Sequence, residues 1–413
     1  MLAGRQTPIQ PSSAMQPRFQ FNRLEFAGSL GDLGTLLPLA IGMILVNKLD
    51  TTGLFFSIGL YYILSGVYFG VTVPIQPMKV ISAYAIAMGL TAHQVLASGL
   101  LMGVLLLLIG ATGAMSLIGR YTPRSVVRGV QLSTGVLLMI QGIKFMLGTS
   151  IFQSLHQMAE PYLTVQSIAG VPIGIIIGVG GGILTFLFLD NKRLPAGLLV
   201  VCCGLLLGLF LNSREGWEQL KIGFYLPQFL PAGMPAGVDF SMVILLLVAP
   251  QMPMTIGNAV IAYTDLSQEY FKDASRRVTY RAACISMGLA NLLSFAFGGM
   301  PLCHGAGGLA AHYRFGARTA GSNLIIGAIF LVLALFLGSG MLVVLHLLPM
   351  AVLGVLLLFA GIQLALTIQD LMSRKDLFVV LTMLGITLAT NLASGFIAGL
   401  ALAYVLKWKK FTI

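Results

Sequence analysis

A lysine at the start of an apolar stretch is the residue whose chemistry most needs an explanation. Lys79 closes the motif TVPIQPMK at residues 72–79 and is followed by the apolar residues 80–90. Proline biases the residue before it towards extended backbone, so we expect a short strand-like piece up to Gln76 and a helix that begins at Pro77. If that helix ends at Met88, it is about 18 Å long at 1.5 Å per residue, too short for a hydrocarbon core of about 30 Å.

A helix that begins inside a membrane leaves its first backbone N–H groups unpaired and carries a partial positive charge there. Such an end attracts anions. Lys79 adds a full charge, and because a lone ammonium in a bilayer costs several kcal/mol it needs an anionic partner. A bound substrate or Asp32 could be that partner; alternatively, Lys79 extends to the membrane interface. The motif therefore predicts an anion site.

The second half of the chain repeats this design at residues 298–308, with the sequence GGMPLCHGAGG. Pro301 again favours an extended segment, and the glycines allow a ligand to approach the backbone before a short helix continues to Tyr313. Interrupted apolar segments at matching places in two halves indicate a transporter's substrate site, whereas the alternative is a pair of proline kinks. His304 could donate to an oxyanion or carry a proton, or it could cap the helix start.

Two further apolar segments contain polar residues. Asp32, in GSLGDLGT at residues 28–35, could carry a coupling proton, coordinate a cation or pair with Lys79; if the span starts later, Asp32 is an ordinary helix-end residue. Gln251, Thr255 and Asn258, in PQMPMTIGN at residues 250–258, offer neutral hydrogen bonds beside two prolines. We expect this segment to supply the opposite wall of the site, with a purely structural kink as the alternative.

The composition identifies an integral membrane protein, because 57% of the residues are hydrophobic, only 9% are charged and the mean hydropathy is +0.93. The four cysteines lie in apolar segments without metal-ligand spacing, so neither disulfides nor a metal site is expected. No nucleotide loop, paired histidine ligands or nucleophile elbow is found. We therefore expect no enzyme and no cofactor, with transport driven by an ion gradient, the substrate's own gradient or a partner.

Apolar runs predict about fourteen spans. They lie near 26–46, 53–70, 73–90, 94–118, 125–147, 169–189, 194–212, 239–263, 281–298, 299–315, 319–338, 341–367, 376–390 and 391–406. An odd number of spans in each half gives the halves opposite orientations, which is the geometry of an inverted repeat. The predicted segments are a disordered cytoplasmic tail at 1–22, a first repeat at 23–212, an extracytoplasmic linker at 213–238, a second repeat at 239–406 and a basic cytoplasmic tail at 407–413.

The net charge of +11 is explained by membrane topology. If both termini are cytoplasmic, most of the 24 basic residues fall on inside loops and tails, as the positive-inside rule requires. The outside loops then hold only Lys48, Lys144, Arg214 and Lys221. Nucleic acid binding is therefore not expected. The absence of a targeting segment favours a bacterial inner membrane, with eukaryotic organelle membranes left open.

Four motifs taken in order resemble the molybdate transporter branch of the sulfate permease superfamily. They are PIQPMK at 74–79, GDLGT at 31–35, PQMP at 250–253 and PLCHGAGGLA at 301–310 followed by YRFGAR at 313–318. The resemblance covers about residues 24 to 406. It implies an all-α membrane fold of two inverted seven-span repeats, similar to uracil permease, in which a core domain moves against a gate domain.

The resemblance also implies uptake of molybdate, with sulfate or tungstate as related substrates and without the regulatory domain that classical sulfate permeases carry after the last span. Residues carried over for the facing helix starts are Gln76, Pro77, Met78 and Lys79, and Cys303, His304, Gly305, Ala306 and Gly307. Asp32 and Gln251 would line the core side. The alternatives are a sulfate or general oxyanion permease and an anion channel. A homodimer is compatible with the sequence, which does not determine the oligomeric state.

Overall fold

The computed structural model describes residues 18–114, 123–150, 153–154, 157–189, 191, 196–211, 218 and 220–407. The described residues are mostly helical, and their strands form two pairs in which each strand has two residues. Parts of the predicted tails and linker, residues 1–17, 213–217, 219 and 408–413, lie outside the described residues. Arg18 and Gln20 of the predicted N-terminal tail bond to the second half, because the Arg18 carbonyl accepts from Ala320 N and Gln20 N donates to Thr319 Oγ1.

The described part of the first half contains three short strands among helices of very different length. Its elements are α1 (Arg23–Ser29), α2 (Leu33–Leu45), α3 (Thr51–Phe69), β1 (Gln76–Pro77), α4 (Lys79–Met88), α5 (Ala92–Thr112), α7 (Arg124–Leu147), β2 (Ser167–Ile168), β3 (Val171–Pro172), α9 (Ile173–Phe188) and α10 (Ala196–Leu211). Of these strands, β2 and β3 pair with each other, whereas β1 has its partner in the second half.

The second half begins with one long helical stretch that contains two π-helical segments. Its elements are α11 (Gly237–Val243), η2 (Ile244–Val248), α12 (Ala249–Met254), η3 (Thr255–Ala262), α13 (Tyr263–Phe271), η4 (Lys272–Ser275), α14 (Tyr280–Ala296), β4 (Leu302–Cys303), α15 (Ala306–Phe315), α16 (Gly321–Leu337), η5 (Gly338–Gly340), α17 (Met341–His346), α18 (Met350–Ala365), η6 (Leu366–Asp370), α19 (Arg374–Ala389) and α20 (Leu392–Val405). The two π-helical segments are η2 and η3.

Six helical stretches in the described part of the chain are long and apolar enough to cross a membrane. The pair α1 and α2, bent by 41°, makes a seventh if it is counted as one span. Four more apolar helices, α4, α9, α10 and α20, are shorter. The chain is therefore a multi-pass membrane protein, and the count of fourteen stays a prediction.

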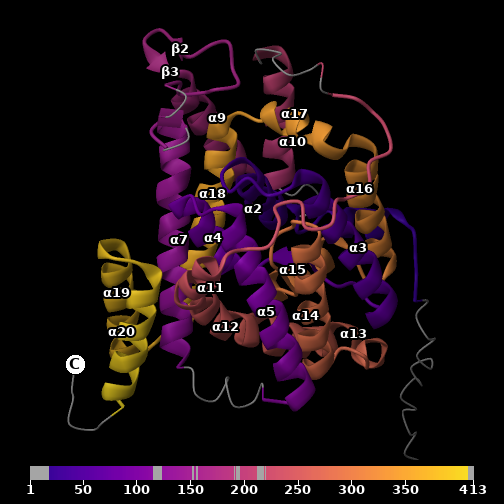
Figure 1. The fold of residues 1–413 in the computed structure, drawn as a ribbon, viewed down its shortest axis with the longest axis vertical. Coiled ribbons are helices and arrows are strands. Elements are labelled where there is room, and N and C mark those ends of the chain that lie inside the picture. The colour runs from indigo at the N-terminus through magenta and orange to yellow at the C-terminus, as the bar shows by residue number, and fades with distance from the viewer. Residues whose placement is uncertain are drawn as a thin grey trace, which may run out of the picture.

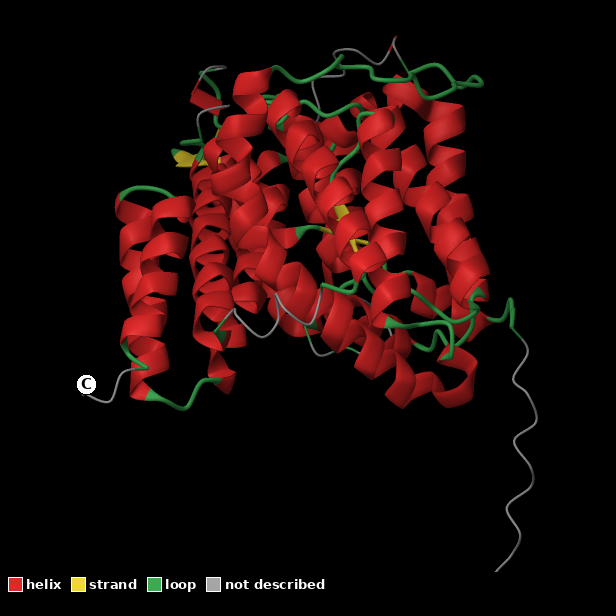
Figure 2. Cartoon of the chain, turned by 60° about the horizontal axis from the view of Figure 1, so that its bottom comes forward, coloured by secondary structure: helices red, strands yellow, loops and turns green. Residues whose placement is uncertain are grey.

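The two predicted breaks meet in the middle of the molecule. Strands β1 and β4 form an antiparallel ladder in which Gln76 lies opposite Cys303 and Pro77 opposite Leu302. Figure 2 shows this small ladder surrounded by helices, whereas β2 and β3 lie at the edge. Because the ladder is antiparallel, the short helices α4 and α15 that follow its strands leave in opposite directions.

The free edges of both extended segments are satisfied by asparagine side chains. Asn291 of α14 accepts from Leu302 N at 3.0 Å and donates to Leu302 O at 2.8 Å. Asn323 of α16 does the same for Val73, with both bonds at 2.8 Å. Each asparagine side chain thus makes the two hydrogen bonds that the backbone of a residue in a neighbouring strand would make. Irregular backbone is stable at membrane depth only when its polar groups are paired in this way.

Two helix starts differ from the prediction. Helix α4 begins at Lys79 rather than Pro77, because Pro77 belongs to the ladder and Met78 N donates to Pro301 O at 2.9 Å. The first span is broken after Ser29, so Asp32 is the N-cap residue of α2 and does not lie inside a continuous helix. At this break a Cβ on Gly31 would lie 2.9 Å from the carbonyl oxygen of Ala311, so α15 packs directly on the backbone.

Helices α7 and α18 pack through matched glycines. A Cβ at Gly135 would lie 2.6 Å from the carbonyl oxygen of Gly361, and one at Gly142 would lie 2.5 Å from that of Gly354. Real Cβ atoms do not approach this closely, so the two backbones are in contact. Figure 1 shows α19 and α20 as a hairpin beside α7, on the side away from α5.

The variant Gly142→Val should destabilise the folded protein, because its side chain would push α18 away from α7. Overpacking of this kind costs about 1–3 kcal/mol. The thermal unfolding midpoint of the purified protein in detergent measures the effect. Gly385→Val is the matched control, since a Cβ at Gly385 meets nothing within 4 Å. Equal midpoints for the two variants would contradict the close packing of α7 on α18.

Candidate functional site

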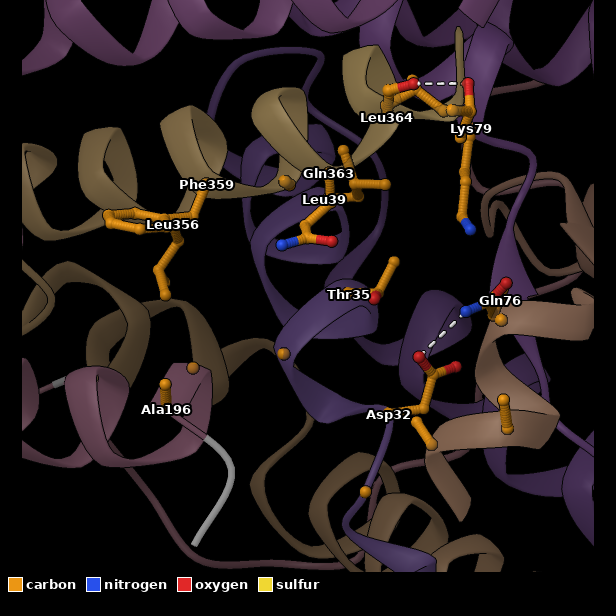
Figure 3. Close-up of a pocket in the computed structure, with 18 of the residues that line it drawn as sticks. Asp32, Thr35, Leu39, Gln76, Lys79, Ala196, Leu356, Phe359, Gln363 and Leu364 are labelled. Carbon is orange, nitrogen blue, oxygen red and sulfur yellow. Dashed lines mark hydrogen bonds between the residues drawn. The ribbon is translucent and has the colours of Figure 1, made fainter. Parts of the chain in front are cut away.

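A cavity of about 760 Å³ opens beside the ladder and is lined in part by polar side chains. One of its walls contains Asp32, Thr35, Gln76, Lys79 and Gly307, from α2, the ladder and the starts of α4 and α15. The facing wall contains Gln131 of α7 and Gln363 of α18. Figure 3 shows the Lys79 side chain pointing into the space between these walls.

The positive charges around the cavity outnumber the negative ones. Its lining includes Lys79, Arg128 and Arg314, against the single carboxylate of Asp32. Arg128 forms an ion pair with Asp370, which also binds Arg124. Among the described side chains, Asp32 and Lys79 face one cavity without forming the salt bridge considered above. The field in the cavity therefore favours anions.

Asp32 is held by Gln76. The amide nitrogen Nε2 of Gln76 donates to Asp32 Oδ1 at 2.8 Å, as the dashed line in Figure 3 marks. Both side chains are buried, with exposed fractions of 3% for Asp32 and 1% for Gln76. The second oxygen of each side chain, Asp32 Oδ2 and Gln76 Oε1, has no hydrogen-bond partner.

The start of α4 is capped from within the protein. Gln251 Oε1 accepts from Val80 N at 2.9 Å and from Ile81 N at 3.2 Å, and Gln251 Nε2 donates to Thr255 Oγ1 at 2.9 Å. Gln251 and Thr255 thus lie on the face of α12 and η3 that packs on α4, and neither lines the cavity. Met254 and Asn258, on another face of the same stretch, line it instead.

His304 is turned away from the cavity. Its Nδ1 lies 3.0 Å from Pro74 O, and its Nε2 lies 2.7 Å from Tyr61 Oη and 3.0 Å from Ser286 Oγ. Because a carbonyl only accepts, Nδ1 carries the hydrogen that joins the imidazole to Pro74. The ring ties the extended segment of the first half to the start of α15 in the second half, which leaves it no free nitrogen for a ligand.

The remaining predicted residues divide into lining and supporting positions. Gln76, Lys79 and Gly307 line the cavity, whereas Pro77, Met78, Cys303, Gly305 and Ala306 do not. Sequence reasoning missed Thr35, Gln131 and Gln363, whereas Asn258, expected in the wall with Gln251 and Thr255, does line the cavity. A glutamine inside an otherwise apolar span is the signal that could have found Gln131 and Gln363, because such residues face the protein interior.

The facing wall is anchored outside the membrane segments by Glu160. Its two carboxylate oxygens accept from Met350 N and Ala351 N, both at 2.7 Å, at the start of α18. Burial raises the pKa of Glu160 to about 7, against the lowering effect of these two backbone hydrogen bonds. A carboxylate at a helix N-terminus is favourable, so Glu160 fixes the end of the helix that carries Gln363.

Comparison with known sequences gives consistent matches over most of the chain. A family model described as "Molybdate transporter of MFS superfamily" matches residues 24–138 and 243–364. "Molybdate transporter 2" of Arabidopsis thaliana is 34% identical over 411 residues, covering 93% of this chain and 87% of the relative. "Molybdate transporter 1" of Chlamydomonas reinhardtii is 30% identical over 469 residues, covering 91% of this chain and 90% of the relative.

Two solved transporters have a similar fold. The transmembrane domain of the bicarbonate transporter BicA of a cyanobacterium matches with a TM-score of 0.65 at 15% identity, covering 91% of this chain and 97% of that domain. The murine Slc26a9 anion transporter matches with a TM-score of 0.65 at 16% identity, covering 95% of this chain and 70% of that structure. The fold of this chain is therefore the SLC26-type fold, as the resemblance to sulfate permeases implies.

Removing the internal cap of α4 should destabilise the protein. In Gln251→Leu the N–H groups of Val80 and Ile81 lose their acceptor, and a buried unsatisfied group costs about 1–3 kcal/mol. We expect a lower thermal unfolding midpoint than in the control Gln363→Leu, whose side chain is exposed to the cavity. A midpoint in Gln251→Leu as high as in that control would show that the cap contributes nothing.

Proposed function

The chain belongs to the molybdate transporter family, and from this premise we propose that it is a secondary active transporter that imports molybdate. The observation that carries the proposal is a cavity with a lysine at the start of a short helix, in a chain whose relatives are named molybdate transporters. A sulfate or general oxyanion permease is the alternative, because sulfate has the same charge and shape as molybdate. An anion channel is the rival from another class.

We propose fourteen spans in two inverted repeats, residues 23–212 and 239–406, joined by the linker 213–238. The antiparallel β1–β4 ladder supports this arrangement, because it relates the two short helices by a reversal of direction. The matching roles of Asn291 and Asn323 support it as well. In this proposal α4 and α15 are half-helices whose starts face the substrate.

The substrate is held between these two starts. Lys79 supplies the charge, and Gln76 and Gly307 contribute hydrogen-bonding groups at the cavity wall. Backbone N–H groups of α4 contribute less than expected, since Gln251 occupies those of Val80 and Ile81. Pro77, Met78, Cys303, His304, Gly305 and Ala306 shape the two starts without lining the cavity, and Thr255 fixes Gln251.

Alternating access comes from movement of the wall that carries Asp32, Gln76 and Lys79 against the wall that carries Gln131 and Gln363. The close glycine packing of α7 on α18 supports movement of the second wall as one rigid body. Arg128 and Arg314 lie on the side that we predict to be cytoplasmic, so a cavity lined by them corresponds to a conformation open to the cytoplasm.

Asp32 is the coupling residue in this proposal. A charged carboxylate beside a dianion is unfavourable, so a proton on Asp32 lowers the free energy of the loaded state. Its buried, half-satisfied carboxylate beside the cavity supports that role. Uptake driven by a proton gradient follows.

The remaining predictions concern the surroundings of the protein. Both termini cytoplasmic, a bacterial inner membrane and a homodimer stay predictions, and the named relatives come from a plant and an alga. Tungstate and sulfate stay candidate substrates beside molybdate.

Saturable uptake of trace molybdate into proteoliposomes tests the function. Excess tungstate should compete, whereas sulfate and phosphate at the same concentration should not. Flux driven equally by sulfate would identify a general oxyanion permease. Conductance without saturation would identify a channel.

In the same assay, Lys79→Ala should abolish molybdate uptake, because the cavity loses the cation at the start of α4. The variant should still insert into the membrane and purify in normal yield. Lys221→Ala, which changes an exposed loop lysine, is the matched control and should transport normally. Undiminished uptake by Lys79→Ala would remove Lys79 from the mechanism.

The variant Asp32→Asn should make molybdate uptake insensitive to external and internal pH, because asparagine stays neutral. Initial rates measured from pH 5 to pH 8 check this. A wild-type pH profile in Asp32→Asn would leave Asp32 with a structural role only.

A further inference from the structure

Two buried oxygens in contacting side chains have no donor. They are Asp32 Oδ2 and Gln76 Oε1, the unused ends of a pair already joined by the 2.8 Å bond from Gln76 Nε2 to Asp32 Oδ1. A buried acceptor without a donor is costly, and here two lie side by side at the cavity. Asp32 Oδ2 and Gln76 Oε1 therefore lack a hydrogen-bond donor in this state of the site, and another state of the site would supply it.

The start of α15 shows where the Gln76 oxygen is directed. A Cβ at Gly305 would lie only 1.7 Å from Gln76 Oε1, and one at Gly308 would lie 2.4 Å from Asp32 Oδ2. The absence of side chains at these two glycines is what gives both oxygens their room. An acceptor oxygen thus occupies the helix start at which an anion would be bound, next to Gly307 in the cavity wall.

The hydrogen-bonding chemistry of Asp32 and Gln76 makes the orientation of the Gln76 amide depend on whether Asp32 carries a proton. An ionised carboxylate only accepts hydrogen bonds, so it requires the Nε2 end of Gln76. A protonated carboxyl group has one O–H donor and is best paired with the Oε1 end. Protonation of Asp32 thus favours the opposite orientation of the same amide.

We propose that Gln76 is a proton-dependent switch in the anion site. When Asp32 is ionised, Nε2 faces Asp32 and Oε1 faces the start of α15, where it repels an oxyanion. When Asp32 takes up a proton, its O–H donates to Oε1, and Nε2 turns to donate to an oxygen of the bound anion. This inference rests on the proposed function, since it requires an oxyanion substrate and a proton on Asp32.

Other titratable and charged groups face Asp32 from every side. Lys79 on α4, Tyr62 on α3 and Cys303 in β4 interact with its charge, and Arg314 on α15 and Arg128 on α7 line the same cavity. The positive members of this set attract the anion in either state of Asp32. The Gln76 amide is the group in this wall that presents an acceptor in one state of Asp32 and a donor in the other. Proton uptake by Asp32 therefore raises the affinity of the site for an anion.

Equilibrium binding of molybdate to the purified full-length protein in nanodiscs, measured by calorimetry from pH 5 to pH 8, tests the switch. Wild-type affinity should fall as pH rises. Gln76→Met, of similar size but without an amide, should bind about tenfold more weakly at pH 5, the effect of one lost hydrogen bond to a charged group, and should depend less on pH. At every pH from 5 to 8, Asp32→Asn should bind molybdate as tightly as the wild type does at pH 5, because the asparagine amide can donate to Gln76 Oε1.

The double variant Asp32→Asn with Gln76→Met should lose the affinity that Asp32→Asn retains. Gln268→Met is the matched control, since it removes an exposed amide that does not line the cavity. It should keep the wild-type pH dependence. Gln76→Glu is a second variant in case the methionine protein does not fold. Its carboxyl group can donate to the anion only when both it and Asp32 are protonated. Two adjacent carboxyl groups share one proton and take up the second only at lower pH, so the fall in affinity should move to lower pH.

The outcomes separate the switch from the function it rests on. If Gln76→Met keeps the full wild-type pH dependence, or if Gln76→Glu leaves its midpoint unchanged, the switch is wrong and Asp32 acts on the anion by its charge alone. If Asp32→Asn keeps the pH dependence, Asp32 is not the coupling residue. If wild type binds no molybdate at any pH, the proposed substrate is wrong, and the switch falls with it.

Discussion

The constraint on which this structure depends is the need to pair every backbone polar group of two broken segments deep inside a membrane protein. The β1–β4 ladder satisfies one edge of each segment, and the amides of Asn291 and Asn323 satisfy the other. His304 adds a third tie, from its ring to the carbonyl of Pro74. With these bonds in place, extended backbone is stable at membrane depth.

Because these backbone groups are already paired, fewer of them remain to bind a substrate. The first N–H groups of α4 are occupied by Gln251, so this helix start offers the anion its lysine more than its amides. Asp32 and Gln76, in contrast, keep one unpaired oxygen each at the start of α15. The two helix starts are therefore unequal: one is closed by a neutral side chain, and the other faces a group that can take up a proton.

The cavity belongs to two packed units. One wall comes from the ladder and the helices around it, and the other comes from α7 and α18, which are held together backbone to backbone by glycines. The SLC26-type fold is shared with solved anion transporters at TM-scores of 0.65.

The sequence alone determined the membrane class, the two breaks and the lysine at the first of them, because hydropathy and proline act locally and do not depend on the rest of the chain. The pairing of the breaks was decided by tertiary structure: nothing local specifies that Gln76 lies opposite Cys303 or that His304 points away from the cavity. The same holds for Gln251, Gln131 and Gln363. Which face of an apolar helix meets the cavity depends on the helices packed against it, and π-helical turns such as η3 shift that face further.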